Sequence, residues 1–276
     1  MTEAPISFHE LEHRGWQAGS TVAGYDRYFS SLTTQSIDAL LDAAAVRAGT
    51  RVLDVATGPG YVARAAAVLG AHPLGLDFAS SQVALAQSRY PELEFREGDA
   101  GALPFPDRNF DAVVTNFGIL HFAQPEPAMR EAFRVLRPGG RFAFTAWDAP
   151  PRTAAFDIVL RATRAHGHST LALPPGPNMF LWSDADECVR RLVAAGFRAP
   201  AVTRLRLLWR LPSADVLFDA MWQGTVRTAA TLRAQAPHSI ETIRRAIVND
   251  AAAYARNGGI ELPMPVVLAS AQRPDQ

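Results

Sequence analysis

The sequence has little of several features that would point to a particular class of protein. It contains a single cysteine, Cys188, so no intramolecular disulfide bond can form and a cysteine-based zinc site is not expected. Its 27 basic and 27 acidic residues balance to a formal net charge of zero. Surfaces that bind phosphate backbones carry an excess of positive charge, so a nucleic-acid substrate is disfavoured. No run of about 18 apolar residues is present, and no membrane-spanning helix is expected.

The beginning of the chain, MTEAPISFHELEH, carries early acidic residues and lacks a basic segment followed by an apolar one. A signal peptide is therefore not expected. Together with the single cysteine, this predicts a soluble, cytoplasmic protein. Apolar residues make up 48% of the 276 positions, enough for a large buried core in one α/β domain.

Strand-like and helix-like segments alternate through the first half of the chain. Five segments combine apolar and β-branched residues in the manner of buried strands: 51–56, 72–78, 93–99, 110–117 and 140–148. The segments between them have helical spacing, as in 61–69, which Gly70 closes. This alternation predicts a doubly wound, mostly parallel sheet with helices on both faces.

The second half follows a different pattern. Residues 186–197 are predicted to be a helix with a capping box formed by Ser183 and Asp186. A sixth strand is predicted over 201–211 and a last one over 266–272, with residues 213–258 helical and divided into two helices by Pro237. Near the N-terminus, a helix that ends before residue 48 has five apolar positions at helical spacing: Ile37, Leu40, Leu41, Ala44 and Ala45.

A glycine-rich turn follows the first predicted strand. Gly58, Gly60 and Ala63 fit the G-x-G-x-x-G/A pattern of nucleotide-binding loops, which alone is a weak signal. Pro59 lies inside the turn and has no N–H to offer, which counts against a pyrophosphate. Asp54 lies among apolar strand residues, where a carboxylate needs a partner. It is expected to orient the loop or to bind an ammonium group; the alternative is a solvated carboxylate at the strand end.

Four motifs occur in one order along residues 45–150: VLDVATGPG, GLD, EGDAGALPFPDRNFDAVVTNFGILHF and EAFRVLRPGGRFAFTAWD. Together they closely resemble the class I S-adenosylmethionine-dependent methyltransferases, particularly the branch that includes ubiquinone and menaquinone methyltransferases. The resemblance is weak outside these residues. The family's first loop glycine is replaced here by Ala56, a change expected to leave the loop intact. The resemblance implies a seven-stranded sheet whose last strand, 266–272, is antiparallel.

The resemblance also implies a cofactor site. Asp54, Gly58 and Gly60 would hold the methionine part of S-adenosylmethionine. Asp77, at the end of the second strand, would bind the ribose, and Phe78 would lie against the adenine. A carboxylate in the place of Asp77 suits the ribose of either S-adenosylmethionine or NAD.

Two further pairs of residues match the family motifs. Asp99 and Ala100 would meet the adenine amino group and ring. Asn116 and Phe117, after the fourth strand, would lie near the carboxylate or sulfonium end of the cofactor.

Methyl transfer is an in-line displacement that chiefly needs alignment and exclusion of water, so neither a base nor a metal is required. His121 is the one candidate base placed by the motifs; the alternative is a loop histidine packed on the next helix. Tyr25 in the leading helix is predicted to face the sulfonium, or else to be a surface aromatic. Trp147 is predicted to line an acceptor pocket, or simply to close the sheet.

The variable half is rich in aromatic and methionine residues, which are Met179, Phe180, Trp182, Trp209, Met221 and Trp222. Trp182 and Trp222, with Trp147, are therefore predicted to contact a small apolar or aromatic acceptor, methylated at O, N or C; ordinary core packing is the alternative. Arg210 and Arg227 are predicted to bind an acidic group of the acceptor or to be solvated. The segment DAD at 184–186 indicates helix capping rather than metal binding.

These interpretations predict a single methyltransferase domain over residues 1–276. It would consist of an N-terminal helical cap (1–48), a cofactor-binding core (49–150) and a substrate-side half (151–276) with the helical insertion 213–258 as part of a lid. Two alternatives remain, an NAD(P)-binding oxidoreductase and an S-adenosylmethionine-binding protein that does not methylate. The sequence carries no signal for oligomeric state or for the identity of the acceptor.

Overall fold

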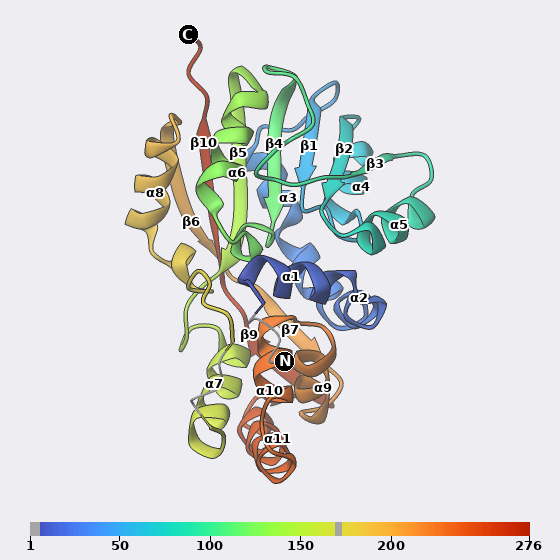
Figure 1. The fold of residues 1–276 in the computed structure, drawn as a ribbon, viewed down its shortest axis with the longest axis vertical. Coiled ribbons are helices and arrows are strands. Elements are labelled where there is room, and N and C mark those ends of the chain that lie inside the picture. The colour runs from blue at the N-terminus through green and yellow to red at the C-terminus, as the bar shows by residue number, and fades with distance from the viewer. Residues whose placement is uncertain (1–5, 169–172) are drawn as a thin grey trace. The chain divides into compact units, whose positions relative to one another are not determined.

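The computed structural model describes residues 6–168 and 173–276. The first five residues, part of the segment for which no signal peptide is expected, lie outside this description. The chain divides into two compact units, each assembled from segments that are distant in sequence (Figure 1). The first unit comprises Met1–Leu32, Asp148–Gly176 and Arg206–Pro265, and the second comprises Thr33–Trp147, Pro177–Leu205 and Val266–Gln276.

The second unit is built on a seven-stranded sheet (Figure 1). Its strands are β1 (Arg51–Val55), β2 (His72–Asp77), β3 (Glu94–Glu97), β4 (Phe110–Asn116), β5 (Leu136–Trp147), β6 (Arg198–Leu205) and β10 (Val266–Gln272). They lie in the order β3-β2-β1-β4-β5-β10-β6. β10 is antiparallel to both neighbours and the other pairs are parallel. The predicted mostly parallel sheet with an antiparallel last strand is confirmed.

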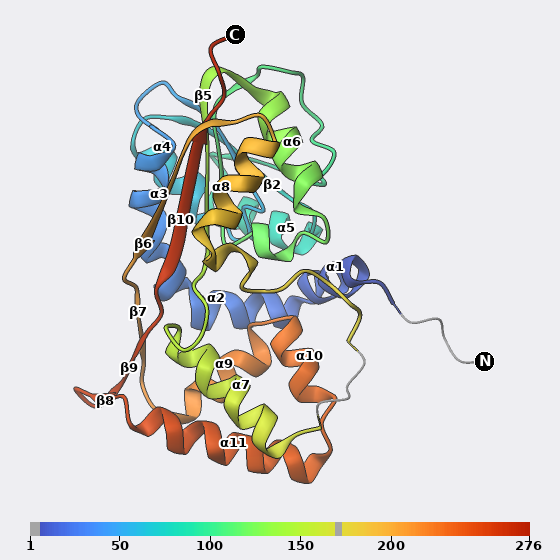
Figure 2. The same cartoon turned by 90° about the vertical axis from the view of Figure 1, so that its left-hand side faces the viewer.

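Helices cover both faces of this sheet, as predicted. Figure 2 shows α3 (Ile37–Ala43) and α4 (Tyr61–Val68) on one face, and α6 (Pro125–Val135) and α8 (Ala185–Ala194) on the other. A fifth helix, α5 (Ser80–Arg89), follows β2 and packs Val83 and Ala86 against Phe95 of β3. Three short 3-10 helices, η1 (Thr34–Ser36), η2 (Ile119–His121) and η3 (Leu181–Ser183), complete the unit.

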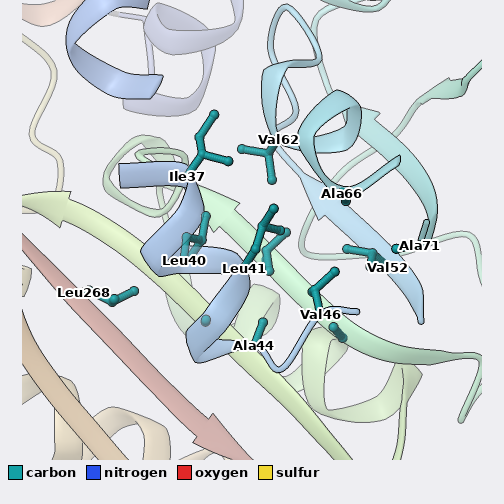
Figure 3. Close-up of a cluster of buried hydrophobic side chains, with 13 residues drawn as sticks. Ile37, Leu40, Leu41, Ala44, Val46, Val52, Val62, Ala66, Ala71 and Leu268 are labelled. Carbon is teal, nitrogen blue, oxygen red and sulfur yellow. The ribbon is translucent and has the colours of Figure 1, made fainter. Parts of the chain in front are cut away.

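The core between α3, α4 and the sheet confirms the helical pattern near the N-terminus. Leu40 and Leu41 are at most 1% exposed and point between Val62 of α4 and the strands (Figure 3). Val52, Val114 and other strand residues complete this cluster. Burial of each leucine contributes ~1.5–3 kcal/mol, so this layer is a main source of stability for the strand ends that carry the site.

The first unit consists of six helices and a small sheet, as far as the described residues show. The helices are α1 (Phe8–Gln17), α2 (Gly19–Thr33, whose last residue belongs to the second unit), α7 (Ala154–His166), α9 (Asp215–Gln223), α10 (Arg227–Arg233) and α11 (Pro237–Ala252). The antiparallel sheet has the order β7 (Leu208–Leu211), β9 (Gly259–Pro263), β8 (Ala255–Arg256). Trp209 is fully buried here; its ring lies 4.6 Å from that of Phe29 and its Nε1 donates to the Tyr28 carbonyl at 2.9 Å.

Several predictions for the second half are wrong in detail. The strand expected over 201–211 is two strands, β6 and β7, in different sheets, and β9 was not predicted. The segment 213–258 contains three helices rather than two and ends in β8. Helix α8 is capped by Asp184, whose carboxylate accepts from the N–H groups of Asp186 and Glu187 at 2.9 and 3.4 Å. The predicted box between Ser183 and Asp186 is replaced by this cap, while capping by the DAD segment is confirmed.

Three of the boundaries between units fall in one row of the large sheet. Val266, the first residue of β10, pairs with Trp147 of β5 on one side and with Leu205 of β6 on the other. The chain leaves the second unit after Trp147 and after Leu205, and it returns at Val266. The division of the chain at 48 and 150 stays a prediction.

Within residues 6–168 and 173–276, every helix is too short or too polar to cross a membrane.

Candidate active site

The loop after β1 adopts a left-handed backbone at three positions. Ala56, Gly58 and Gly60 have φ values of 55°, 53° and 83°. A Cβ at Gly60 would lie 2.8 Å from the Phe95 ring and 3.1 Å from the Tyr90 ring, so close packing also requires this glycine. At Gly58 the nearest atom to such a Cβ is Oε1 of Gln82 at 4.0 Å, which leaves room for a ligand to approach the backbone.

Asp54 joins this loop to the helix that follows it. The side chain is fully buried, and its Oδ2 accepts from the Thr57 hydroxyl at 2.6 Å and from the Ala63 N–H at 3.2 Å. Its Oδ1 has no hydrogen-bond partner among the described residues. Burial raises the pKa of Asp54 to about 7, against the two hydrogen bonds and with a small contribution from the charge of Asp77. The geometry agrees with the predicted loop-orienting role, and one acceptor oxygen stays available.

Asp77 lies at the end of β2 and forms a hydrogen bond to the same loop. Its Oδ2 accepts from the Gly58 N–H at 2.9 Å, and its Oδ1 accepts from the Ala79 N–H at 3.0 Å. Burial raises the pKa of Asp77 to about 6, and the hydrogen bonds and the nearby charge of His121 oppose that rise. The Phe78 N–H donates to this carboxylate as well, and a remaining lone pair can accept from a further donor.

The structure adds two polar residues that sequence reasoning missed. Thr57 donates to Asp54 from within the loop. Gln82 of α5 is 3% exposed, and its Oε1 faces the Gly58 position without a hydrogen-bond partner in the described parts of the chain. The sequence contains a signal for Gln82, because it adjoins Val83 on the buried side of α5. A polar side chain in such a position costs free energy unless it has a hydrogen-bond partner.

These features fit S-adenosylmethionine better than a dinucleotide. Asp54 Oδ1 and Gln82 Oε1 are among the buried oxygens without a hydrogen-bond partner in the described residues, and both are acceptors. The cofactor offers an ammonium group, ribose hydroxyls and an amino group as donors. A pyrophosphate needs free loop N–H groups, yet those of Gly58 and Gly60 are bonded to Asp77 and to the Thr57 carbonyl. Two nearby carboxylates would also repel its charge.

The remaining residues predicted to meet the adenine lie near the ends of β2 and β3. Phe78 is half-buried and follows Asp77 directly. Asp99 is exposed and accepts from the Gly101 N–H at 2.8 Å, while Ala100 is 8% exposed. No contact in the structure tests their predicted roles, which stay predictions.

Asn116 ends β4 in a network of hydrogen bonds. Its Oδ1 accepts from the hydroxyls of Ser36 and Thr145 at 2.8 and 2.5 Å, and its Nδ2 donates to the Thr33 carbonyl at 3.0 Å. Phe117 follows with a φ of 59°, and its ring centroid lies 4.2 Å from that of Trp147. A left-handed backbone costs a non-glycine residue ~1–2 kcal/mol. Such strain persists where the surroundings hold it and is typical of functional sites.

His121 and Trp147 lie at the same end of the sheet. His121 ends η2 after β4, is half-buried and lies close enough to Asp77 for its charge to influence that carboxyl. Trp147 is 6% exposed at the last position of β5. The predicted base and acceptor-lining roles stay predictions.

The other predicted substrate residues do not gather into one site of either unit. Trp182 is 1% exposed in the second unit, with its ring edge-on to Phe144 at 5.1 Å, which favours the core-packing alternative. Trp222 is half-buried in the first unit and stacks on Phe218 at 5.6 Å. Tyr25, also of the first unit, lies edge-on to Trp16 at 5.5 Å. Because Tyr25 and the loop after β1 belong to different units, the geometry of the loop does not test the role predicted for Tyr25, which stays a prediction.

The two arginines considered for an acidic acceptor group already have carboxylate partners. Arg210 is exposed and pairs with Glu261 at 3.0 Å. Arg227 is not solvated: its side chain is 15% exposed and its Nε lies 3.1 Å from Oε1 of the buried Glu12. Burial disfavours the charged form of Arg227 and lowers its pKa. The charge of Glu12 opposes this shift and offsets part of the cost of burying the guanidinium group.

Across the described ranges, no three histidine, cysteine or acidic residues are grouped so that they could hold a metal ion.

Comparison with known sequences supports the assignment of the loop. A family model described as a methyltransferase domain matches residues 53–144. The demethylmenaquinone methyltransferase of Renibacterium salmoninarum is 31% identical over 167 residues, which are 57% of this chain and 70% of that protein. The demethylmenaquinone methyltransferase of Thermus thermophilus is 44% identical over 130 residues, covering 44% of this chain and 57% of that protein. The match thus spans less than two thirds of the Thermus protein.

Solved structures share the fold. The YcgJ protein of Bacillus subtilis superimposes with a TM-score of 0.57 at 21% identity, covering 88% of this chain and 99% of that one. Phosphoethanolamine N-methyltransferase 2 of Haemonchus contortus, solved with S-adenosylmethionine, gives a TM-score of 0.60 at 17% identity over 99% of this chain and 61% of that one.

The sheet order, the loop with its unpartnered acceptors and the sequence relatives lead to one assignment. S-adenosylmethionine is the cofactor, and the predicted methyltransferase function is confirmed over the NAD(P)-dependent alternative. The chain belongs to the class I S-adenosylmethionine-dependent methyltransferases, in the branch that includes the menaquinone and ubiquinone methyltransferases.

Proposed function

We propose that this methyltransferase acts on a small aromatic acceptor of the quinol type, a ring that carries a hydroxyl group. Two observations support this acceptor class. The relatives above are demethylmenaquinone methyltransferases. In addition, the nearly buried rings of Phe117 and Trp147 lie against each other at the ends of β4 and β5, where they would form an apolar, aromatic wall beside the acceptor.

The observation that carries the cofactor side of the proposal is the pair of buried acceptors without partners beside the loop. Asp54 Oδ1 would accept from the ammonium group of S-adenosylmethionine. Asp77 would accept from the ribose hydroxyls with its remaining lone pairs. Gly58 would let the backbone approach the cofactor, and Gln82 Oε1 would take a further donor.

Bound S-adenosylmethionine supplies a methyl group on a positively charged sulfur, and transfer breaks the carbon–sulfur bond to leave S-adenosylhomocysteine. The residues of the chain align the acceptor with that bond and exclude water. His121 would remove the proton of the acceptor hydroxyl, which makes the acceptor a stronger nucleophile.

A binding and a transfer measurement together test the proposal. Titration calorimetry with S-adenosylmethionine, S-adenosylhomocysteine and NADH should show binding of the two S-adenosyl compounds only. Incubation with methyl-labelled S-adenosylmethionine and a panel of quinols, phenols, amines and nitrogen heterocycles should label the quinols fastest. His121→Asn should lower kcat by about 10²–10⁴-fold if the histidine is the base, with little change in the affinity for S-adenosylhomocysteine.

Contrary outcomes separate the alternatives. Binding without transfer to any member of the panel would favour an S-adenosylmethionine-binding protein that does not methylate. Faster labelling of amines or heterocycles than of quinols would overturn the proposed acceptor class and leave the methyltransferase assignment intact.

A further inference from the structure

The hydroxyl group of Thr145 lies where β4 and β5 meet at the active-site edge. Thr145 is fully buried and pairs with Asn116 in the parallel register of these strands. Its Oγ1 donates to Asn116 Oδ1 at 2.5 Å and accepts from the Phe117 N–H at 3.1 Å. One hydroxyl therefore fixes the last residue of β4 and the residue that follows it.

Phe117 needs such fixation because its backbone is left-handed. The Phe117 N–H also lies 3.2 Å from the carbonyl oxygen of Thr145, so both polar oxygens of Thr145 receive the same donor. The Phe117 ring then meets Trp147, two residues beyond Thr145 on β5. The strained backbone of Phe117 is thus bonded to Thr145, and its ring packs against Trp147 in the same short stretch of β5.

The other contacts of Asn116 show which way the network acts. Its carbonyl oxygen accepts from Ser36 as well as from Thr145, and its amide nitrogen donates to the Thr33 carbonyl. These partners fix the amide plane, with its oxygen on the side of the two hydroxyls. The Thr145 hydroxyl must then give its only proton to Asn116, which turns its lone pairs toward the Phe117 N–H.

We infer that Thr145 is a positioning residue for methyl transfer, which acts by holding Asn116 and the left-handed Phe117 against Trp147. The inference rests on the proposed function, because it takes Phe117 and Trp147 to lie beside the reacting groups. In-line transfer is sensitive to such placement, since a displacement of about 1 Å can cost 10²-fold in rate. The hydroxyl acts through its hydrogen bonds to Asn116 and to the Phe117 N–H.

The test compares three substitutions. Thr145→Val removes the hydroxyl at nearly constant volume, and Thr145→Ser keeps it. Thr115→Val is the matched control, because Thr115 is 1% exposed on β4 and its hydroxyl has no hydrogen-bond partner among the described residues. We expect Thr145→Val to lower kcat at saturating cofactor and acceptor by about 10- to 100-fold. Thr145→Ser should stay within about threefold of the wild type and Thr115→Val within about twofold.

A readout without acceptor separates this inference from the proposed function. Because Phe117 is predicted to lie at the cofactor, Thr145→Val should raise the dissociation constant of S-adenosylhomocysteine by about fivefold, equivalent to ~1 kcal/mol. Thr145→Ser should restore it. Rates are expressed per S-adenosylhomocysteine-binding site, so that unfolded protein is not counted.

A Thr145→Val protein with a lowered melting temperature but unchanged kcat and unchanged affinity would show that the hydroxyl is structural only, and would overturn the inference. Failure of Thr145→Ser to restore activity would also overturn the inference. If Thr145→Ser is as impaired as Thr145→Val, the hydroxyl is not responsible for the loss. If the wild type methylates no acceptor, the proposed function fails while the affinity measurement still decides the role of Thr145.

Discussion

At the residue scale, Ala56 shows how a departure from the family pattern is accommodated. The loop was expected to survive the loss of the family's first glycine, and it does, with alanine in the left-handed conformation that glycine would adopt freely. The Ala56 methyl group packs closely against Gly118, where a Cβ would lie 2.5 Å from it. The loop thus keeps its shape with some backbone strain.

Ala56→Gly should therefore raise the free energy of unfolding by about 0.5–1 kcal/mol, because relief of the left-handed strain exceeds the added entropy of the unfolded chain. Urea denaturation measures the change. Ala65→Gly within α4 is the matched control and should lower the free energy of unfolding by about 1 kcal/mol. A loss of stability in both variants would contradict the argument.

The buried carboxyl of Asp54 predicts a pH dependence. In an unfolded chain its pKa is about 3.9, whereas burial raises it to about 7 in the folded protein. The folded state thus binds more protons between these values, so this group makes stability fall as pH rises from about 4 to about 7. Asp77, with a pKa raised to about 6, acts in the same direction.

Binding of the cofactor should reverse this penalty, because an ammonium group beside Asp54 favours its ionised form. We expect the affinity for S-adenosylhomocysteine to rise up to tenfold per pH unit toward pH 7 and to fall only at the higher pH where the α-amino group of the ligand loses its proton. Calorimetry in buffers of different ionisation enthalpy should detect the released proton. Asp54→Asn should bind weakly with no rise between pH 5.5 and 7; a rise as steep as in the wild type would assign it to another group.

At the element scale, the two loop glycines should respond differently to the same substitution. Gly60→Ala places a Cβ 2.8 Å from the Phe95 ring at a φ of 83°, so strain and overpacking should together lower the free energy of unfolding by about 2–4 kcal/mol. Gly58→Ala meets no protein atom closer than 4.0 Å and should cost only about 1 kcal/mol.

For cofactor affinity, in contrast to stability, Gly58 should matter more than Gly60. The Gly58→Ala protein should fold and yet bind S-adenosylhomocysteine at least tenfold more weakly, since the new methyl group occupies the space left for the ligand. Thermal unfolding and calorimetry on both variants check this. Equal affinity of the Gly58→Ala protein and the wild type would place the cofactor elsewhere on the loop.

The elements also show where sequence patterns stop being informative. The core strands were predicted because each is an apolar run between turn residues, and the motifs fixed their order. The run 201–211 gave a single strand because apolar and β-branched residues continue through Arg206 and Leu207 without a glycine or proline. The pattern of a strand does not encode which sheet it joins, so β6 and β7 could not be told apart.

At the scale of the whole molecule, all residues from Asp54 to Phe117 that are predicted to bind the cofactor belong to the second unit. Hydrogen exchange should therefore show added protection by S-adenosylhomocysteine first in the loop 54–63 and in the ends of β2, β3 and β4. Hydrogen exchange in the peptide around Tyr25 separately tests the prediction that Tyr25 lies at the cofactor. Unchanged exchange in the loop would contradict the site, whereas protection confined to α11 would move it to the first unit.

The residues predicted to bind the cofactor lie in recognisable sequence motifs, whereas those predicted to bind the acceptor do not. Asp54, Asp77 and the glycines lie within motifs whose spacing reflects one local chain path. The partners of Asn116 come from Thr33, Ser36 and Thr145, up to 83 positions away, and isolated hydroxyl residues leave no recognisable pattern. Aromatic residues in the variable half were equally compatible with a pocket and with a core, as Trp182 and Trp209 illustrate.

The shared row of Trp147, Val266 and Leu205 has a consequence for how such a chain can change. The segment 206–265 leaves the large sheet from one strand and rejoins it on the adjacent strand, at residues that are already partners. Its length and sequence can therefore vary without altering the register of any strand that carries the cofactor loop. A chain built in this way can have this segment lengthened, shortened or replaced while the strands around the loop after β1 stay as they are.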